Sequence, residues 1–412
     1  METTVARRPL LWPATAVWAA GRVVLLLFVF KVVVFPGPDV TSDVSVIYHG
    51  WYDVLRGGTF PLEDVTWQYP PAAALAVLSP GLLPFLGYAE AFFVLAFLSD
   101  LAAFALLLHA GRRPGRTLAG AWLWVAGVPL LGPTVYARYD VMVTAVAVAA
   151  LLAGARRPRV MGALVGLGAM LKVWPALLLI GVRRRAVWAA AVVSAAVLAG
   201  VFALAMPGSF AFLTFQRDRG TEVESLGSLV FHVARQYGWD GDVLLNYGSV
   251  EFLGPYVSVV STVALFLTGA AFAWLLLWRL VAVRFRPCTV VDAAFAAVLL
   301  FTVTSRVISP QYMVWLVGLG AVCLCFRATR MRWPALLVLL ACPVTLLEFP
   351  LWFAHVVASD TLGVSLLFAR NGLLVAAAVT AAVLLWRSTV PSLRKERPPA
   401  QAEPAEETPV SS

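Results

Sequence analysis

The stretch RVMGALVGLGAMLKVWPALLLIGVR, residues 159–183, has arginine at both ends and 23 almost entirely apolar residues between them, at positions 160–182. A single helix of about 20 residues would place its ends on opposite sides of a membrane. Short loops rich in Lys and Arg stay on the cytoplasmic side, so both ends of this stretch should lie there. The stretch therefore predicts a short hairpin that enters the membrane and returns, with its turn near Lys172 and the helix-breaking Pro175. Irregular backbone at membrane depth is tolerated only beside protein or water, so we expect Lys172 to point into a cavity.

The rest of the chain consists of apolar runs separated by further basic loops. Hydrophobic residues make up 61% of the 412 positions and charged residues only 13%, which excludes soluble globular folds. The basic loops contain Arg112, Arg113 and Arg116; Arg156, Arg157 and Arg159; Arg183 to Arg185; Arg279, Arg284 and Arg286; and Arg327, Arg330 and Arg332. Nearly all acids lie in the alternate loops, which should therefore face outward. We interpret the net charge of +9 as topology and contact with anionic lipid headgroups, not as nucleic-acid binding.

These runs predict one all-α, multi-pass domain over residues 1–386, with about 12 transmembrane helices when the hairpin counts as two. Besides the hairpin, the expected spans are 12–35, 88–109, 118–133, 140–154, 186–206, 255–280, 289–304, 311–326, 334–349 and 361–386. Two long external segments, 36–87 and 207–254, interrupt them, and the first should carry interfacial helices at 44–55 and 71–83. Both termini should be cytoplasmic, and residues 387–412 should form a disordered tail.

Acids and cations gather in the predicted external segments. Asp43 follows the first span directly, and from its position it is either the N-cap of the next helix or a functional carboxylate. Arg306 lies at an outer turn and belongs to a small set of external cations, the others being Arg56, Arg138, Lys172, Arg217, Arg219 and Arg235. Cations at the outer membrane surface suit a lipid-linked phosphate or diphosphate. The sequence contains no clustered carboxylates that would hold a metal, and we expect no cofactor.

A set of short motifs in a fixed order resembles glycosyltransferase family 87, the polyprenyl-phosphate-mannose-dependent α-(1→2) mannosyltransferases of actinobacteria. The motifs are Asp43…Tyr48; Gly58…Pro61…Asp64…Tyr69-Pro70-Pro71; Arg138-Tyr139-Asp140; Gly166…Lys172…Pro175; Arg219-Gly220…Glu224-Ser225; and Ser309-Pro310-Gln311-Tyr312. They cover roughly residues 20 to 330. No single motif is specific, and the resemblance rests on the whole set in sequence.

The resemblance implies the C-type glycosyltransferase fold and an inverting transfer of a sugar, mannose in the family, from a polyprenyl-phosphate donor to an envelope glycolipid or glycan. The reaction would take place on the external face of the cell membrane. Asp43 matches the catalytic base of the family. We expect Lys172, Arg219 and Arg306 to bind the donor phosphate. The expected substrate-binding residues are Tyr48, His49, Tyr69, Arg138, Asp140, Glu224, Gln311 and Tyr312. Gln68 receives no role. The sequence leaves the sugar and the acceptor open.

Several alternatives remain at this stage. A transporter or flippase of lipid-linked saccharides would also have many spans and a cationic cavity, and a non-catalytic membrane scaffold is a third possibility. Charged residues within spans are costly unless they are paired, so we expect a structural pair between Asp100 and Arg22 or Lys31. Arg370 with Asn371 either reaches the donor phosphate or packs inside the bundle. His232 and His355 are weaker candidates for an acceptor site.

Overall fold

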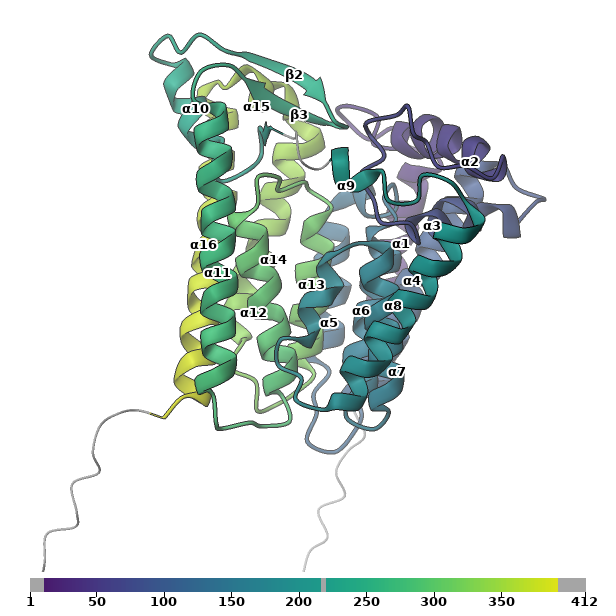
Figure 1. The fold of residues 1–412 in the computed structure, drawn as a ribbon, viewed down its shortest axis with the longest axis vertical. Coiled ribbons are helices and arrows are strands. Elements are labelled where there is room, and N and C mark those ends of the chain that lie inside the picture. Colours follow the sequence, from purple (N-terminus) through teal and green to yellow (C-terminus); the bar gives the residue numbers. More distant parts are fainter. Residues whose placement is uncertain (1–10, 216–219, 392–412) are drawn as a thin grey trace, which may run out of the picture.

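The computed structural model describes residues 11–215 and 220–391. Its long helices run side by side, and short helices and a small sheet cover one end of the bundle (Figure 1). Arg219, a predicted phosphate ligand, lies outside the described residues, as does the predicted tail from residue 392 onward.

Six helices are long and apolar enough to cross a membrane, and several shorter apolar helices pack among them. The long ones are α1 (Trp12–Val29), α4 (Tyr88–Gly111), α8 (Arg185–Ala205), α11 (Val257–Val281), α14 (Arg332–Leu346) with its extension η5 (Leu347–Leu351), and α16 (Thr361–Thr389). The shorter ones are α3 (Ala73–Leu78) with η2 (Ser79–Leu82), α5 (Ala119–Leu130), α6 (Asp140–Ala153), α7 (Pro158–Leu171), α12 (Thr289–Thr304) and α13 (Tyr312–Leu324). Each predicted apolar run thus forms a helix, and the protein is a mostly helical, multi-pass membrane protein.

The predicted reversal at Lys172 is present. Helix α7 ends where Lys172 adopts an extended backbone, with φ −158° and ψ 136°. The chain then folds back in the 3-10 helix η4 (Trp174–Leu179), which begins with Pro175 in its first turn and packs against α7. The returning part, η4, has six residues and is therefore shorter than a membrane-spanning helix. At the turn, Gly168 passes close to Pro175.

Helix α7 then packs along α8 through two glycines spaced four residues apart. A Cβ atom at Gly162 would lie 2.2 Å from the backbone oxygen of Val187, and one at Gly166 would lie 2.4 Å from that of Ala191. Only glycine permits this approach, as in other small-residue contacts between membrane helices. The contact fixes α7, and with it the position of Lys172, against the long α8 span.

The basic loops lie together at one end of the bundle, away from the sheet and α2 (His49–Arg56) (Figure 1). Arg327 donates from Nε to the backbone oxygen of Arg116 at 3.1 Å, and Arg279 donates from Nη2 to that of Val182 at 2.8 Å. Arg183 reaches the backbone oxygen of Ala282. These contacts bring loops from four parts of the sequence to one face, as the charge pattern predicts.

The prediction of an all-α protein is wrong for the segment 207–254. This segment contains α9 (Phe212–Phe215), α10 (Leu229–Arg235) and a three-stranded antiparallel sheet in the order β1 (Thr221–Glu222), β3 (Ser249–Leu253), β2 (Asp242–Asn246). The β2–β3 turn places Tyr247 and Gly248 at positive φ, 47° and 76°. Such turns match the twist of a two-stranded hairpin, and Gly248 supplies the local signal.

The ion pair inside the spans forms between Arg22 and Asp100, which is one of the two pairings that the sequence predicted. Arg22 donates from Nε and Nη2 to the two carboxylate oxygens of Asp100 at 2.8 and 3.1 Å, and both side chains are buried. Trp124 and Tyr136 also donate to Asp100, so its carboxylate is held by several donors. Lys31 is exposed and pairs with Asp39 instead. The buried pair ties α1 to α4 and α5.

Candidate active site

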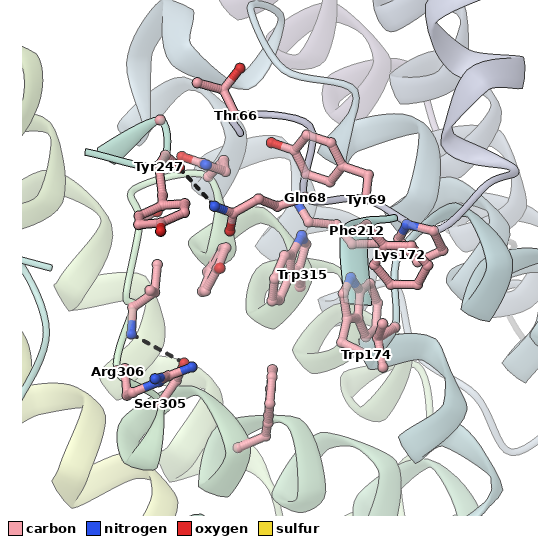
Figure 2. Close-up of a pocket in the computed structure, with 18 of the residues that line it drawn as sticks. Thr66, Gln68, Tyr69, Lys172, Trp174, Phe212, Tyr247, Ser305, Arg306 and Trp315 are labelled. Carbon is pink, nitrogen blue, oxygen red and sulfur yellow. Dashed lines mark hydrogen bonds between the residues drawn. The ribbon is translucent and has the colours of Figure 1, made fainter. Parts of the chain in front are cut away.

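A cavity of about 400 Å³ opens where the segment 36–87, the reversal at Lys172, the β2–β3 turn and the loop after α12 meet (Figure 2). The first external segment enters it as one continuous helix, the π-helical η1 (Asp43–Tyr48) followed by α2, close to the predicted interfacial helix. Of the predicted site residues, seven line the cavity: Asp43, Tyr48, Tyr69, Lys172, Arg306, Gln311 and Tyr312. Residues far apart in the sequence thus form one site.

The Asp43 carboxylate lies at the cavity wall, one third exposed, and faces a guanidinium group. Its Oδ2 is 2.7 Å from Nη2 of Arg138, whose side chain is 11% exposed. Arg138 also donates from Nη1 to the backbone oxygens of Val40 and Ala137 at 3.1 and 2.8 Å. The N-cap of the helix is Ser42, and an Asp39–Thr41 turn precedes it, so the interpretation of Asp43 as the N-cap is wrong. Asp43 is held in place by an arginine from another part of the chain.

Lys172 projects into a cage of aromatic rings and is ion-paired. Its Nζ lies 5.1–5.6 Å from the ring centres of Tyr69, Tyr139, Tyr312 and Trp315. The same Nζ is 2.7 Å from Oδ1 of Asp140, whose side chain is 2% exposed. The expected position of Lys172 in a cavity is confirmed. Asp140, a predicted substrate-binding residue, pairs with Lys172 and is not among the residues that line the cavity.

Stacked aromatic rings form one wall of the cavity. The ring centres of Tyr312 and Trp315 are 4.0 Å apart and those of Trp315 and Trp174 are 5.1 Å apart, with interplanar angles of 21° and 20°. The indole of Trp315 also donates from Nε1 to Oδ1 of Asp140 at 2.7 Å. The rings are therefore fixed in orientation and form an aromatic wall, a kind of lining that is common where proteins bind small molecules.

The Arg306 loop (305–310) is anchored by a carboxylate that our sequence analysis missed. Glu222, buried in β1, accepts hydrogen bonds from the backbone N–H of Ile308 at 2.7 Å and the hydroxyl of Ser309 at 2.8 Å. Its own N–H donates to the backbone oxygen of Arg306 at 3.1 Å. These contacts fix the loop that carries Arg306 into the cavity. The only sequence signal for this role was the position of Glu222 two residues before Glu224. The charged run around it has the pattern of a solvated loop.

The tip of the β2–β3 hairpin forms part of the cavity lining. Gln68 donates from Nε2 to the backbone oxygen of Tyr247 at 3.2 Å, and the two residues lie side by side in Figure 2. A Cβ atom at Gly248 would contact Thr66 at 3.4 Å. Gln68, to which the sequence assigned no role, therefore links the first external segment to the hairpin.

The family model of glycosyltransferase family 87 matches residues 67–310, more than half of the chain. The chain belongs to glycosyltransferase family 87. The matched range of this family 87 glycosyltransferase includes Lys172 and Arg306, and it begins after Asp43.

Among solved structures, the chain is similar to ArnT from Cupriavidus metallidurans bound to undecaprenyl phosphate, with a TM-score of 0.45, 16% sequence identity, and coverage of 92% of this chain and 78% of that one. No curated protein matches the chain.

Two further predicted residues of this family 87 enzyme, His49 and Glu224, do not line the cavity. His49 is exposed and stacks on Tyr88, with ring centres 4.8 Å apart. Glu224 is buried beside Arg370, which donates to its backbone oxygen at 3.0 Å. Burial, Glu348 and Glu222 raise the pKa of Glu224 well above its usual value. Glu224 therefore packs against Arg370 and is not part of the cavity lining.

The other open candidates have structural partners. Arg370 is fully buried and binds Glu348, so it packs inside the bundle. His232 is buried, donates from Nε2 to the backbone oxygen of Val223 at 2.7 Å, and lies 2.8 Å from the hydroxyl of Ser359. Burial lowers the pKa of His232 to about 4, which keeps the ring neutral. His355 pairs with Asp360 at 2.5 Å. Neither histidine lines the cavity.

Proposed function

We propose that this membrane glycosyltransferase transfers a sugar, mannose as in the resemblance that its motifs carry, from a polyprenyl-phosphate donor to an envelope glycolipid or glycan on the external face of the cell membrane. The C-type architecture, the outward orientation of the cavity and the cytoplasmic location of both termini belong to the same proposal. Family membership supports group transfer, which a transporter or scaffold would not require.

The observation that carries the proposal is that one cavity brings together a carboxylate, two cations and an aromatic wall. Asp43 enters from the first external segment, Lys172 from the reversal after α7, and Arg306 from the loop after α12. Transfer of an acyl or phosphoryl group would not need an aromatic wall. A sugar bound to a phosphate would use all three features. The cavity is therefore suited to a glycosyl phosphate.

The apolar side of the cavity supports a lipid-linked donor. Leu265 of α11, Phe301 of α12 and Leu213 of α9 line it, and Leu265 and Leu213 are exposed on the surface of the protein. A free sugar nucleotide would gain nothing from such a side. A polyprenyl chain would be stabilised there, because its apolar surface would be removed from water.

In the proposed reaction, an acceptor hydroxyl attacks the anomeric carbon of the donor while the bond between that carbon and the phosphate oxygen breaks. The Asp43 carboxylate removes the hydroxyl proton, and the bonding electron pair leaves with the phosphate. Attack from the opposite face inverts the anomeric centre. Lys172 and Arg306 stabilise the charge that develops on the departing phosphate. Arg138 holds the carboxylate of Asp43 in one orientation.

The test measures transfer of labelled mannose from polyprenyl-phosphate mannose by the purified protein in lipid nanodiscs. Asp43→Asn should reduce turnover by about a hundredfold or more, because an amide cannot take the proton. Donor binding should persist, because the amide oxygen can still accept the hydrogen bond from Arg138. Glu63→Gln is the matched control, since Glu63 is an exposed acid of the same segment away from the cavity lining.

Two results would contradict the proposal in different ways. Wild-type turnover of the Asp43→Asn variant would remove Asp43 as the base while leaving the transferase activity intact. Movement of the intact donor between leaflets, with no sugar transferred to any envelope fraction, would favour the flippase alternative.

A further inference from the structure

A second cavity, of about 560 Å³, lies at the opposite, basic end of the bundle and is lined mainly by arginines. Arg286 comes from the loop between α11 and α12, Arg327 and Arg330 come from the loop between α13 and α14, and Arg332 is the first residue of α14. We call this the arginine cavity. Its polar lining contains no carboxylate among the residues that the structure describes. Four exposed arginines from two separate parts of the sequence therefore line one space.

This convergence exceeds what membrane topology requires. The positive-inside rule depends on how many Lys and Arg residues a loop carries, not on where their side chains meet. Like charges gathered around one cavity repel one another, and an anion in the cavity would relieve that repulsion. The arrangement is thus that of a site for an anion, beyond a topological signal.

The loop that carries Arg327 and Arg330 and leads into Arg332 has a fixed shape. Thr329 donates from Oγ1 to Oδ1 of the buried Asp292 in α12 at 2.6 Å, and the N–H of Met331 donates to the same hydroxyl at 3.1 Å. Arg327 is tied to the neighbouring basic loop through the backbone oxygen of Arg116. The arginines are therefore presented by an ordered loop anchored on a membrane helix, which lowers the entropic cost of gathering them around a ligand.

The remaining lining residues indicate which anion fits. Trp333 is 68% exposed at the start of α14, and Leu384 is half-buried on α16. An apolar surface of this kind beside a membrane span meets acyl chains, and an exposed tryptophan is typical of the headgroup level of a bilayer. Guanidinium groups bind phosphate oxygens through paired hydrogen bonds. We propose that the arginine cavity binds the phosphate of an anionic phospholipid, with the acyl chains along Trp333 and Leu384.

The test uses the purified full-length protein in a neutral detergent. Binding of short-chain phosphatidylglycerol is measured by microscale thermophoresis, beside phosphatidylcholine of the same chain length and soluble glycerol 3-phosphate. The double variant Arg330→Gln/Arg332→Gln removes two charges from the cavity. Arg157→Gln/Arg159→Gln removes two exposed charges from a different basic loop and is the matched control. Each arginine near an anionic lipid contributes about fivefold in affinity, so the cavity variant should bind phosphatidylglycerol about 25-fold more weakly. The control should stay within about twofold of the wild type.

The proposal is overturned if both double variants lose the same affinity, which would indicate general surface charge. It is also overturned if phosphatidylcholine binds as tightly as phosphatidylglycerol, or if glycerol 3-phosphate does, which would indicate a site for soluble anions. If the double variant does not fold, Arg286→Gln tests the same cavity from the other loop. That variant should lose about fivefold, and an unchanged affinity would refute the proposal. None of these outcomes depends on the proposed transferase activity.

Discussion

Lys172 has two roles in the proposed mechanism: it neutralises Asp140 and it binds the donor phosphate. A double variant can separate the two roles. In the structure its ammonium group neutralises Asp140, whose side chain is 2% exposed, while the same group faces the cavity. Lys172→Ala should therefore have two effects: loss of a countercharge for the donor phosphate, and a buried carboxylate left with one fewer partner. A drop in activity of that single variant would not tell them apart.

The size of the structural effect follows from the burial of the pair. Removing one partner of a buried ion pair costs about 3–5 kcal/mol, because the remaining charge stays desolvated. Replacing both partners by neutral groups of similar volume is often close to neutral. We therefore expect Lys172→Met to lower the free energy of unfolding by about 3 kcal/mol or more, and Lys172→Met/Asp140→Asn to recover most of it. Asn at position 140 can still accept the hydrogen bond from Trp315.

Activity should not follow stability in this series. The double variant keeps the aromatic cage and the fold but lacks the cation, so its KM for the polyprenyl-phosphate donor should stay at least tenfold above that of the wild type. Asp140→Asn alone should keep donor use within a few-fold, because Lys172 remains. Unfolding is followed by heating in detergent, and KM is measured with labelled donor. Recovery of both stability and donor KM in the double variant would show that Lys172 serves only to neutralise Asp140.

Three further predictions concern other parts of the molecule. Glu222→Gln removes the charged acceptor that anchors the Arg306 loop, so donor KM should rise about tenfold. The melting temperature should fall as well, since hydrogen bonds to a charged group contribute about 1.5–3 kcal/mol each. An unchanged KM would mean that the loop keeps its shape without this anchor. The folded protein holds His232 neutral down to about pH 4, while the histidine of the unfolded chain takes up a proton below about pH 6.5. Stability should therefore fall as the pH decreases from about 6.5 to about 4, and His232→Gln should flatten that part of a plot of melting temperature against pH. An unaltered plot would mean that another group titrates in this range. The proposed orientation predicts that a cysteine in place of the exposed Ser45 reacts with an impermeant maleimide on intact cells, whereas one in place of the exposed Arg157 does not. The native cysteines are buried and should give little background labelling. Reaction at position 157 would reverse the proposed topology.

The helix pattern could be predicted because its causes are local. Runs of apolar residues form helices at membrane depth since no other local structure satisfies the backbone there. The reversal at Lys172 could also be predicted, because Pro175 breaks a helix locally and the stretch between Arg159 and Arg183 is too short for two full membrane helices. The small sheet could not, because β1 contributes only two residues and pairs with a strand about 30 positions later. Only Gly248 in the hairpin turn gave a local hint.

The partners of the site residues show the same limit. The sequence singled out Asp43, Lys172 and Arg306, but it could not say that Arg138 holds Asp43 or that Asp140 lies behind Lys172. It also missed Glu222, because an acid within a charge run has the same local pattern whether it is solvated or buried under another loop.

The sequence by itself determined the membrane class, the positions of the helices, the segregation of basic loops from acidic ones and the family of the enzyme. These follow from hydropathy, charge and short motifs, each of which acts over one turn or one span. Only the tertiary structure decided which side chains share the cavity, that Glu224 and Arg370 are buried away from it, and that four arginines converge at the opposite end. Those outcomes depend on how each helix is rotated and how closely it packs, as between α7 and α8, and side-chain contacts between distant segments set that packing rather than any local pattern.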